Sequence, residues 1–210
     1  MKARKLILIV FIAFVGMIFS FSAVQANTIA LSPPQVDRYI NGGPFIATVS
    51  QITPDGLVGD GFITFCLEKN EFFSWYKDYN YEISPFAVGG SGGAVGGQDP
   101  LDPMSAYLYY NFRMNPDAYN QAALQAAFWH IEDEDYLPSE STDETVENKA
   151  WEYVHTAEGK WTGIGPVVVL NLFDGNSLIQ SQLGLMVPEP TTVLLLGLGL
   201  FGLGLVRKKS

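Results

Sequence analysis

The sequence is poor in cysteine and in positive charge. Cys66 is the single cysteine among 210 residues, so one chain cannot form an internal disulfide. Lysine and arginine number 12 against 22 aspartates and glutamates, which gives a formal net charge of −10. An acidic chain repels the phosphates of nucleic acids and of anionic membrane surfaces, so neither is an expected partner.

Long apolar runs occur only at the two ends of the chain. The first run, residues 6–21, follows three basic residues and precedes a small-residue site that ends at Ala26. A basic start, an apolar run and a cleavage site in this order are typical of a secretory signal peptide. We therefore expect residues 1–26 to be removed and the protein to be exported. An uncleaved N-terminal anchor is the alternative.

The second run, residues 191–206, is a marginal membrane span. At about 1.5 Å per residue it reaches roughly 24 Å, short of the roughly 30 Å hydrocarbon core. A basic cluster, residues 207–209, follows it and is expected to stay cytoplasmic. The membrane is therefore expected to be contacted only through this tail, before any processing.

Pro188, Glu189 and Pro190 stand directly before this run. Pro-Glu-Pro, a short Gly- and Leu-rich apolar helix and a basic end closely resemble the PEP-CTERM sorting signal of exported proteins from Gram-negative bacteria. The resemblance covers residues 188–210. It implies an exosortase as partner during export, transient anchoring in the inner membrane, removal of the tail, and transfer to the cell surface or extracellular matrix. A plain C-terminal anchor is the alternative.

Residues 27–187 are enough chain for one domain. Six of the 12 basic residues but only one of the 22 acidic residues lie in the two terminal segments, which leaves six basic against 21 acidic residues and a net charge near −15. The aromatic and β-branched content is typical of a globular domain with a core, not of a disordered tail.

The pattern of this domain predicts strands, then helices, then strands. Strands are expected at residues 44–50, 61–67, 80–84, 165–172 and 182–187. Helices are expected from 103 to 112, from 116 to 131 and from about 141 to 158. This order favours an α+β fold: an antiparallel β-sheet, or a barrel or sandwich, interrupted by a helical insert of about three helices.

Capping residues mark the expected helix ends. Asp102 and Asn115 each precede a proline suited to the first helical position, so both are expected N-caps. Ser141 and Glu144 have the spacing of a capping box, and Gly159 is expected to stop the third helix.

Two stretches of the sequence are candidate ligand sites. The Gly-rich residues 89–97 lack a lysine and the strand-to-helix context of a nucleotide-binding loop, so we interpret them as a flexible loop and expect no cofactor. The acidic residues from Glu132 to Glu147 suggest calcium, but their spacing matches no EF-hand loop. A solvated acidic loop without a metal is favoured.

Gln125 lies on the side of the second helix that the pattern predicts to be buried. Ala118, Ala122 and Trp129 precede or follow it by seven, three and four positions, so all four are expected on one helical face. A buried carboxamide costs free energy unless its donors and acceptors find partners. The buried position of Gln125 therefore requires an explanation.

Cys66 lies in an apolar strand of a chain expected in an oxidising compartment, where a free thiol is prone to oxidation. It is either a buried structural residue, half of an intermolecular disulfide, or a thiol held in another covalent form. A hydrolase that uses Cys66 and His155 is disfavoured, because activated cysteines favour helix N-termini or cationic surroundings. His130 lies about 140° around the helix from Gln125 and is not an expected base.

The segments Phe65-Cys66-Leu67-Glu68 and Leu124-Gln125-Ala126-Ala127-Phe128-Trp129 together resemble the thioester domains of bacterial surface proteins. In that family, a cysteine after an aromatic residue in a strand bonds to the glutamine of a Thr-Gln-x-Ala-(Ile/Val)-Trp helix motif. Gln125, Ala127 and Trp129 match this motif, whereas Leu124 and Phe128 depart from it.

The resemblance implies an internal Cys66–Gln125 thioester. Trp129 would shield it from hydrolysis and Ala127 would let the sheet approach, although ordinary core packing explains both residues equally well. The implied function is a single-use covalent adhesin, not a turnover enzyme. It would acylate an amine or hydroxyl on an extracellular polysaccharide, a matrix protein or another cell surface. The alternative is a non-covalent structural matrix protein of the exopolysaccharide layer, with Cys66 a core residue.

Overall fold

The structure is a computed structural model of the chain that describes residues 27–36, 38–49, 57, 61–89, 94–138 and 145–186. Both terminal apolar runs and the expected capping box at 141–144 fall outside these residues. Among the helices in the described ranges, none has the length and apolar character needed to cross a membrane.

One antiparallel sheet of seven strands forms the larger part of the domain. Its strands are β1 (Thr28–Ser32), β2 (Phe45–Val49), β3 (Phe62–Thr64), β4 (Asp78–Ser84), β7 (Val167–Asp174), β8 (Ser177–Leu178) and β9 (Gln182–Leu185). They run in the order β3-β2-β1-β4-β7, and β8 and β9 both pair with β7. The short strands β5 (Phe86–Val88) and β6 (Gln98–Pro100) pair separately as a hairpin.

The sheet curls so strongly that its two ends meet next to Cys66. Just beyond β3, Cys66 forms an antiparallel bridge with Gln182 of β9. The backbone N–H of Leu183 donates to the carbonyl of Phe65, and that of Leu67 donates to Ser181, both at 3.1 Å. Leu57 also forms an antiparallel bridge with Met186, but the described strands do not form a closed barrel.

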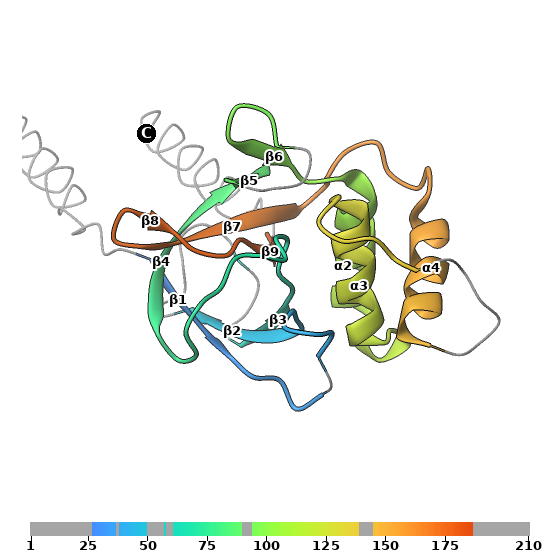
Figure 1. Cartoon of the computed structure of the whole chain (residues 1–210), viewed down its shortest axis with the longest axis horizontal. Helices are drawn as coiled ribbons and strands as arrows, with labels where there is room; N and C mark the ends of the chain where they lie inside the picture. Colours follow the sequence, from blue (N-terminus) through green and yellow to red (C-terminus); the bar gives the residue numbers. More distant parts are fainter. Residues whose placement is uncertain are drawn as a thin grey trace, which may run out of the picture.

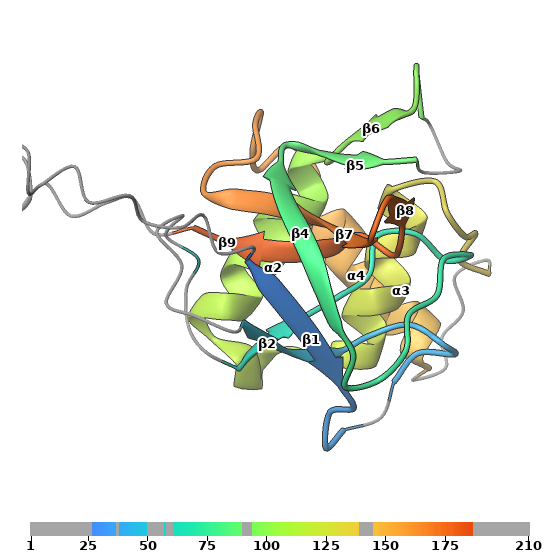
Figure 2. The same cartoon turned by 90° about the vertical axis from the view of Figure 1, so that its left-hand side faces the viewer.

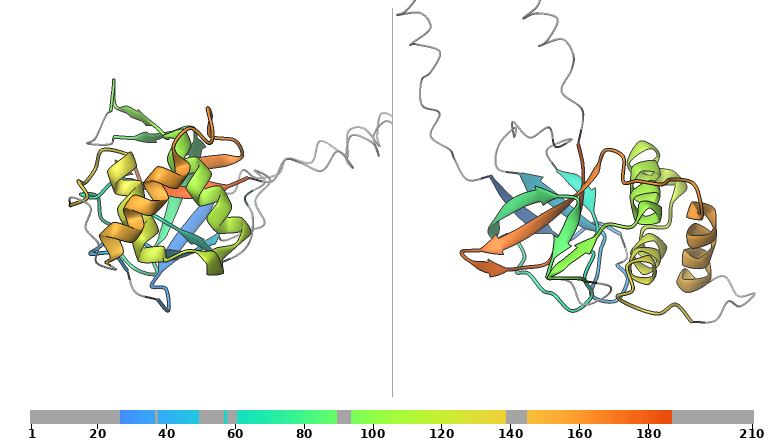
Figure 3. Two further views of the ribbon diagram at one scale, coloured as in Figure 1. Left: turned by 90° about the vertical axis from the view of Figure 1, so that its right-hand side faces the viewer. Right: turned by 90° about the horizontal axis from the view of Figure 1, so that it is seen from above.

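Three helices are inserted between β6 and β7: α2 (Pro103–Met114), α3 (Gln121–Ile131) and α4 (Val146–Ala157). They gather on one side of the sheet, with α4 farthest from the strands (Figure 1). From the opposite side, β1 and β4 face the viewer and the helices lie behind them (Figure 2). Seen from above, the sheet and the helices again lie on opposite sides of the domain (Figure 3, right). The predicted α+β fold with a helical insert is confirmed.

The helix ends agree in part with the expected caps. The Asp102 side chain accepts a hydrogen bond from the N–H of Met104 at 2.7 Å, so the predicted start of α2 is confirmed. α4 begins later than expected, because Thr145 is its N-cap. Gly159, in the left-handed region at φ +65°, follows the end of α4 as expected.

The predicted second helix was wrong at its start. Asn115 makes no side-chain cap, and Pro116–Ala118 form only a 3₁₀ turn, labelled η1. α3 begins after Asn120, whose side chain accepts from the backbone N–H three residues later at 3.0 Å. Two cap signals compete here and the second one caps the α-helix. Ala118 is therefore exposed and does not share the buried helical face of Gln125.

Candidate functional site

Cys66 and Gln125 are 59 residues apart in the sequence and in contact in the core. The Cys66 thiol donates to Oε1 of Gln125, with a Sγ–Oε1 distance of 3.4 Å. Both residues have an exposed fraction of 0%. The structure therefore brings together the two residues that the sequence singled out and removes both from water.

The extended segment that continues β3 to Cys66 separates two parts of the core. Phe65 points toward the helices, where its ring centroid lies 5.2 Å from that of Phe112 and 5.1 Å from that of Phe128. Cys66, the next residue, belongs instead to the cluster inside the curled sheet, together with Phe45 and Trp129. Alternation along an extended chain explains the two directions.

α3 is a core helix on all sides. Its residues 122–129 are all buried, and four of these eight are alanines. Small side chains let neighbouring elements approach the helix backbone closely. Ala127 has an exposed fraction of 0% and packs in the cluster that the helices share with the sheet. Trp129, one turn after Gln125, packs in the sheet cluster that contains Cys66.

Every polar atom of the Gln125 amide has a partner. Oε1 accepts from the backbone N–H of Gly43 at 2.7 Å and from the backbone N–H of Cys66 at 3.2 Å. Nε2 donates to the carbonyl of Cys66 at 2.9 Å. These hydrogen bonds offset the free-energy cost of burying the carboxamide.

A tight loop from Tyr39 to Gly43 covers the pair. The N–H of Gly42 donates to the carbonyl of Tyr39 at 2.8 Å, and the Tyr39 ring lies 5.9 Å from the Trp129 ring. A Cβ atom on Gly42 would lie 2.6 Å from Trp129, and one on Gly43 would lie 2.6 Å from Oε1 of Gln125. Sequence reasoning missed this loop, although two adjacent glycines often mark a close backbone approach.

Burial raises the pKa of the Cys66 thiol well above its ordinary value. The Trp129 indole acts in the opposite direction on this pKa. Its Nε1 is buried and has no partner at hydrogen-bonding distance. The thiol is therefore protonated at neutral pH, and the indole Nε1 is a buried donor without a hydrogen-bond partner in the cluster that contains Cys66.

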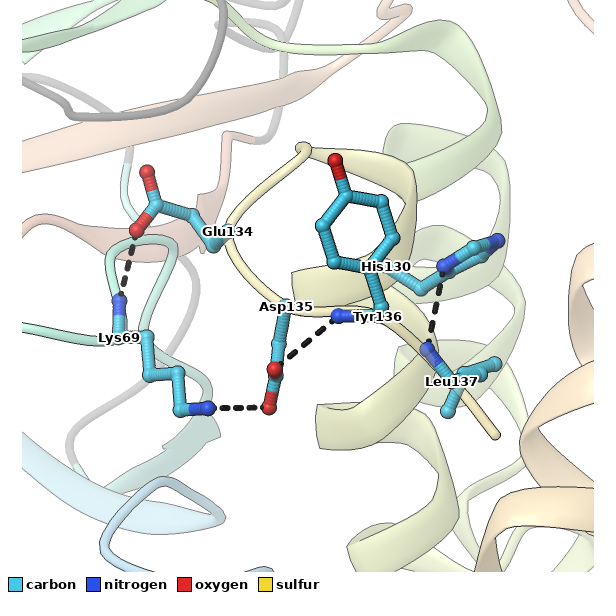
Figure 4. Close-up of polar contacts among 6 residues, drawn as sticks. All are labelled: Lys69, His130, Glu134, Asp135, Tyr136 and Leu137. Atoms are coloured by element: carbon cyan, nitrogen blue, oxygen red, sulfur yellow. Dashed lines mark hydrogen bonds and ion pairs between the residues drawn. The ribbon is translucent and has the colours of Figure 1, made fainter.

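Lys69 connects the loop that follows Cys66 to the turn that ends α3. Its backbone N–H donates to Glu134 at 3.1 Å, and its Nζ forms an ion pair with Asp135 (Figure 4). The N–H groups of both acidic residues donate to the carbonyl of Trp129, at 2.8 and 3.0 Å. The loop after Cys66 is thereby fastened to the turn that ends α3.

Among the described residues of the acidic stretch after α3, Asp133 is exposed and Glu134 and Asp135 are partly exposed, as expected for a solvated loop, whereas Glu132 is buried. Glu132 is only 8% exposed, because its carboxylate accepts from the N–H of Asp102 at the start of α2. Burial raises the pKa of Glu132 to about 8. Among the described residues, no three His, Cys, Asp or Glu side chains are grouped so as to hold a metal ion.

Neither histidine lies in the environment of the thiol. The His155 side chain is half exposed on α4, contacts Glu158 and stacks on Trp151. His130 packs on the same tryptophan, at 4.6 Å between ring centroids, and accepts from the N–H of Leu137 (Figure 4). The arrangement gives no support to a hydrolase that uses Cys66 and His155.

Residues 187–208 match the family model of the PEP-CTERM protein-sorting motif. The sorting signal expected at residues 188–210 is therefore confirmed. The motif implies export and surface association in a Gram-negative bacterium, with processing by an exosortase.

Comparisons of the whole chain with known proteins identify no family. No match was found among curated proteins. Among solved structures, the chain is similar to the N-terminal thioester domain of a surface protein from Clostridium perfringens, with 11% identity and a TM-score of 0.48 over 76% of this chain and 98% of that one. A likeness at this level carries no argument about the chemistry at Cys66.

Proposed function

We propose that Cys66 and Gln125 form an internal thioester, and that the protein uses it once as a covalent adhesin at the cell surface. The observation that carries the proposal is the contact between the Cys66 thiol and the Gln125 amide, at 3.4 Å from Sγ to Oε1 with both groups fully buried. The resemblance of residues 65–68 and 124–129 to thioester-domain motifs agrees with it.

Thioester formation balances without any other reactant. Sγ of Cys66 adds to Cδ of Gln125, the thiol proton is transferred to Nε2, the Cδ–Nε2 bond breaks and ammonia leaves. In free solution this exchange is unfavourable and slow. Here the fold holds the thiol against the amide, and such proximity corresponds to an effective molarity of about 10⁵ M or more in well-oriented systems.

The product is a stored electrophile. An amine or hydroxyl of a partner attacks the thioester carbonyl, the Gln125 acyl group becomes an amide or ester, and the Cys66 thiol is released. Because nothing restores the thioester, the reaction does not turn over. The sorting motif at residues 187–208 supports a surface location, where an extracellular polysaccharide, a matrix protein or another cell supplies the nucleophile.

Trp129 and Ala127 have supporting roles in this proposal. Trp129 is 1% exposed and lies under the Tyr39–Gly43 loop, so it keeps water from the bond. Ala127 is too small to hold neighbouring elements away from α3. Neither residue takes part in bond making.

A non-covalent structural matrix protein is the second candidate. The hydrogen bonds of the Gln125 amide favour it, because they let the unreacted glutamine remain buried without an unsatisfied group. Cys66 is then a small core residue protected from oxidation by its burial.

The intact mass of the exported protein separates the two candidates. A thioester lowers the mass by one ammonia, and methylamine then adds to the protein and exposes one titratable thiol. Cys66→Ala and Gln125→Ala abolish both effects. Gln121→Ala, one turn earlier on α3, is the matched control and retains them. An unmodified mass with a thiol that titrates on unfolding would overturn the thioester and favour the non-covalent candidate.

A further inference from the structure

We infer that the backbone N–H groups of Gly43 and Cys66 form an oxyanion hole for acyl chemistry at Gln125. The inference rests on the proposed thioester. It identifies the groups that lower the barrier to forming the thioester and to transferring its acyl group.

Two donors from separate elements converge on one oxygen. The Gly43 N–H comes from the loop over α3 and lies 2.7 Å from Oε1, and the Cys66 N–H comes from the segment just beyond β3 and lies 3.2 Å from it. Donors of an oxyanion hole lie about 2.7–3.1 Å from the position that the oxyanion takes; in the resting amide the Gly43 N–H is within this distance of Oε1 and the Cys66 N–H is just beyond it. The carbonyl that accepts both hydrogen bonds is the one that the thiol contacts.

The charge that develops during the reaction falls on this oxygen. When Sγ adds to Cδ, the π electron pair of the carbonyl moves to Oε1 and the tetrahedral intermediate carries an oxyanion. In a site without water, fixed N–H dipoles stabilise that charge more than they stabilise the neutral amide. Because burial keeps the thiol protonated, the thiol proton moves to Nε2 as Sγ adds, so the intermediate carries the oxyanion together with a positively charged Nε2, which then leaves as neutral ammonia.

Cys66 has two parts in this arrangement. Its side chain is the nucleophile, and its own backbone N–H is one of the donors, a combination that also occurs in serine proteases. The same two N–H groups polarise the thioester carbonyl once it has formed. They therefore promote the later attack by an amine or hydroxyl as well as the first step.

Gly43 is required at its position because a Cβ atom there would lie 2.6 Å from Oε1. A side chain would push the oxygen away from the donor. The two adjacent glycines, Gly42 and Gly43, thus let a backbone N–H approach a side-chain oxygen on a helix that lies 82 residues later in the sequence.

Infrared spectroscopy of the full-length protein with ¹³C at the glutamine side-chain carbonyl tests the inference directly. Two strong donors lower the stretching frequency of the thioester carbonyl. We expect the folded protein to absorb at or below the frequency of a small thioester in water. A frequency equal to that of a thioester in an apolar solvent would show a carbonyl that is merely packed, and would overturn the inference.

The Gly43→Ala variant gives a second readout, with Gly163→Ala as control because a Cβ atom there meets nothing within 4 Å. After refolding, loss of ammonia from Gly43→Ala should be slower by roughly 10²–10³-fold, the effect of removing one oxyanion-hole donor. If Gly43→Ala does not fold, the infrared result on the natural protein decides.

The outcomes distinguish this inference from the proposed function. A thioester mass together with an apolar-solvent carbonyl frequency, or with an unchanged rate in folded Gly43→Ala, overturns the oxyanion hole and leaves the thioester standing. A natural protein without a thioester mass overturns both, since the two N–H groups then only anchor an unreacted amide.

Discussion

Lys69 and Asp135 form an ion pair that joins the loop after Cys66 to the turn after α3. Their side chains are 32% and 28% exposed. The two segments that leave the reactive pair are thus held together by a contact at the surface of the domain, while the pair itself is completely buried. We therefore expect that opening this contact gives water or a nucleophile access to Cys66.

Replacing Lys69 by Met should therefore change reactivity more than stability. A partly exposed ion pair contributes no more than about 1 kcal/mol, so the free energy of unfolding should fall by that amount or less. The rates of thioester hydrolysis and of methylamine addition should rise several-fold, as measured by mass against time. Lys77→Met is the matched control, because Lys77 forms an ion pair with Asp174 of β7. Equal rates in the two variants would contradict this role of Lys69.

Replacing Trp129 by Phe should slow acyl transfer while the thioester still forms. The indole Nε1 is a buried donor without a partner in the same cluster as Cys66, so we expect it to donate to the sulfur, which leaves as a thiolate when an amine attacks. A hydrogen bond to a charged group contributes about 1.5–3 kcal/mol, which corresponds to a roughly ten- to hundredfold slower reaction with methylamine. Trp161→Phe, whose ring packs on Tyr107 and Tyr110, should react at the natural rate. An unchanged rate in Trp129→Phe would limit that residue to packing.

Local signals explain which elements could be predicted from the sequence. The start of α2 follows from Asp102 and Pro103, which act within one turn of the helix. Each of the five predicted strand segments contains a strand or most of one, because apolar alternation is also a local pattern. β6 (Gln98–Pro100) was missed because proline and aspartate disfavour strands, and its pairing with β5 is set by the hairpin.

The candidate site could be predicted only in part. Cys66 and Gln125 stood out because a lone cysteine and a buried amide are unusual in themselves. The contact of Gly43 with Gln125 spans 82 residues, and that of Lys69 with Asp135 spans 66. No local period encodes either contact, since each depends on how the loops meet after the sheet has curled and α3 has docked.

Stability should fall as the pH rises. Burial raises the pKa of Glu68 to about 8, of Glu71 to about 7 and of Glu132 to about 8. Since these values exceed the roughly 4.3 of an unfolded glutamate, the folded state binds more protons. The stabilisation is complete below about pH 4 and is lost as the pH passes through 7–8, by several kcal/mol at about 1.4 kcal/mol per pKa unit.

Urea unfolding between pH 5 and pH 9 measures this dependence. Glu132→Gln keeps an acceptor for the N–H of Asp102 but cannot ionise, so its stability should change less with pH than that of the natural protein. The exposed Glu152→Gln should leave the slope unchanged. A stability that is constant or rises over this range would show that the buried carboxyls do not have raised pKa values.

Replacing Gly42 by Ala should destabilise the fold around the reactive pair. The added Cβ atom would lie 2.6 Å from the ring of Trp129 and 2.8 Å from Cγ of Gln125. Because the ring is buried and cannot move into solvent, the loop must shift, and overpacking of this kind costs about 1–3 kcal/mol. Urea unfolding of Gly42→Ala should show that loss, whereas Gly163→Ala, with open space around its Cβ, should unfold within about 0.5 kcal/mol of the natural protein. Equal stability of the two variants would mean that the loop does not press on Trp129 as the structure shows.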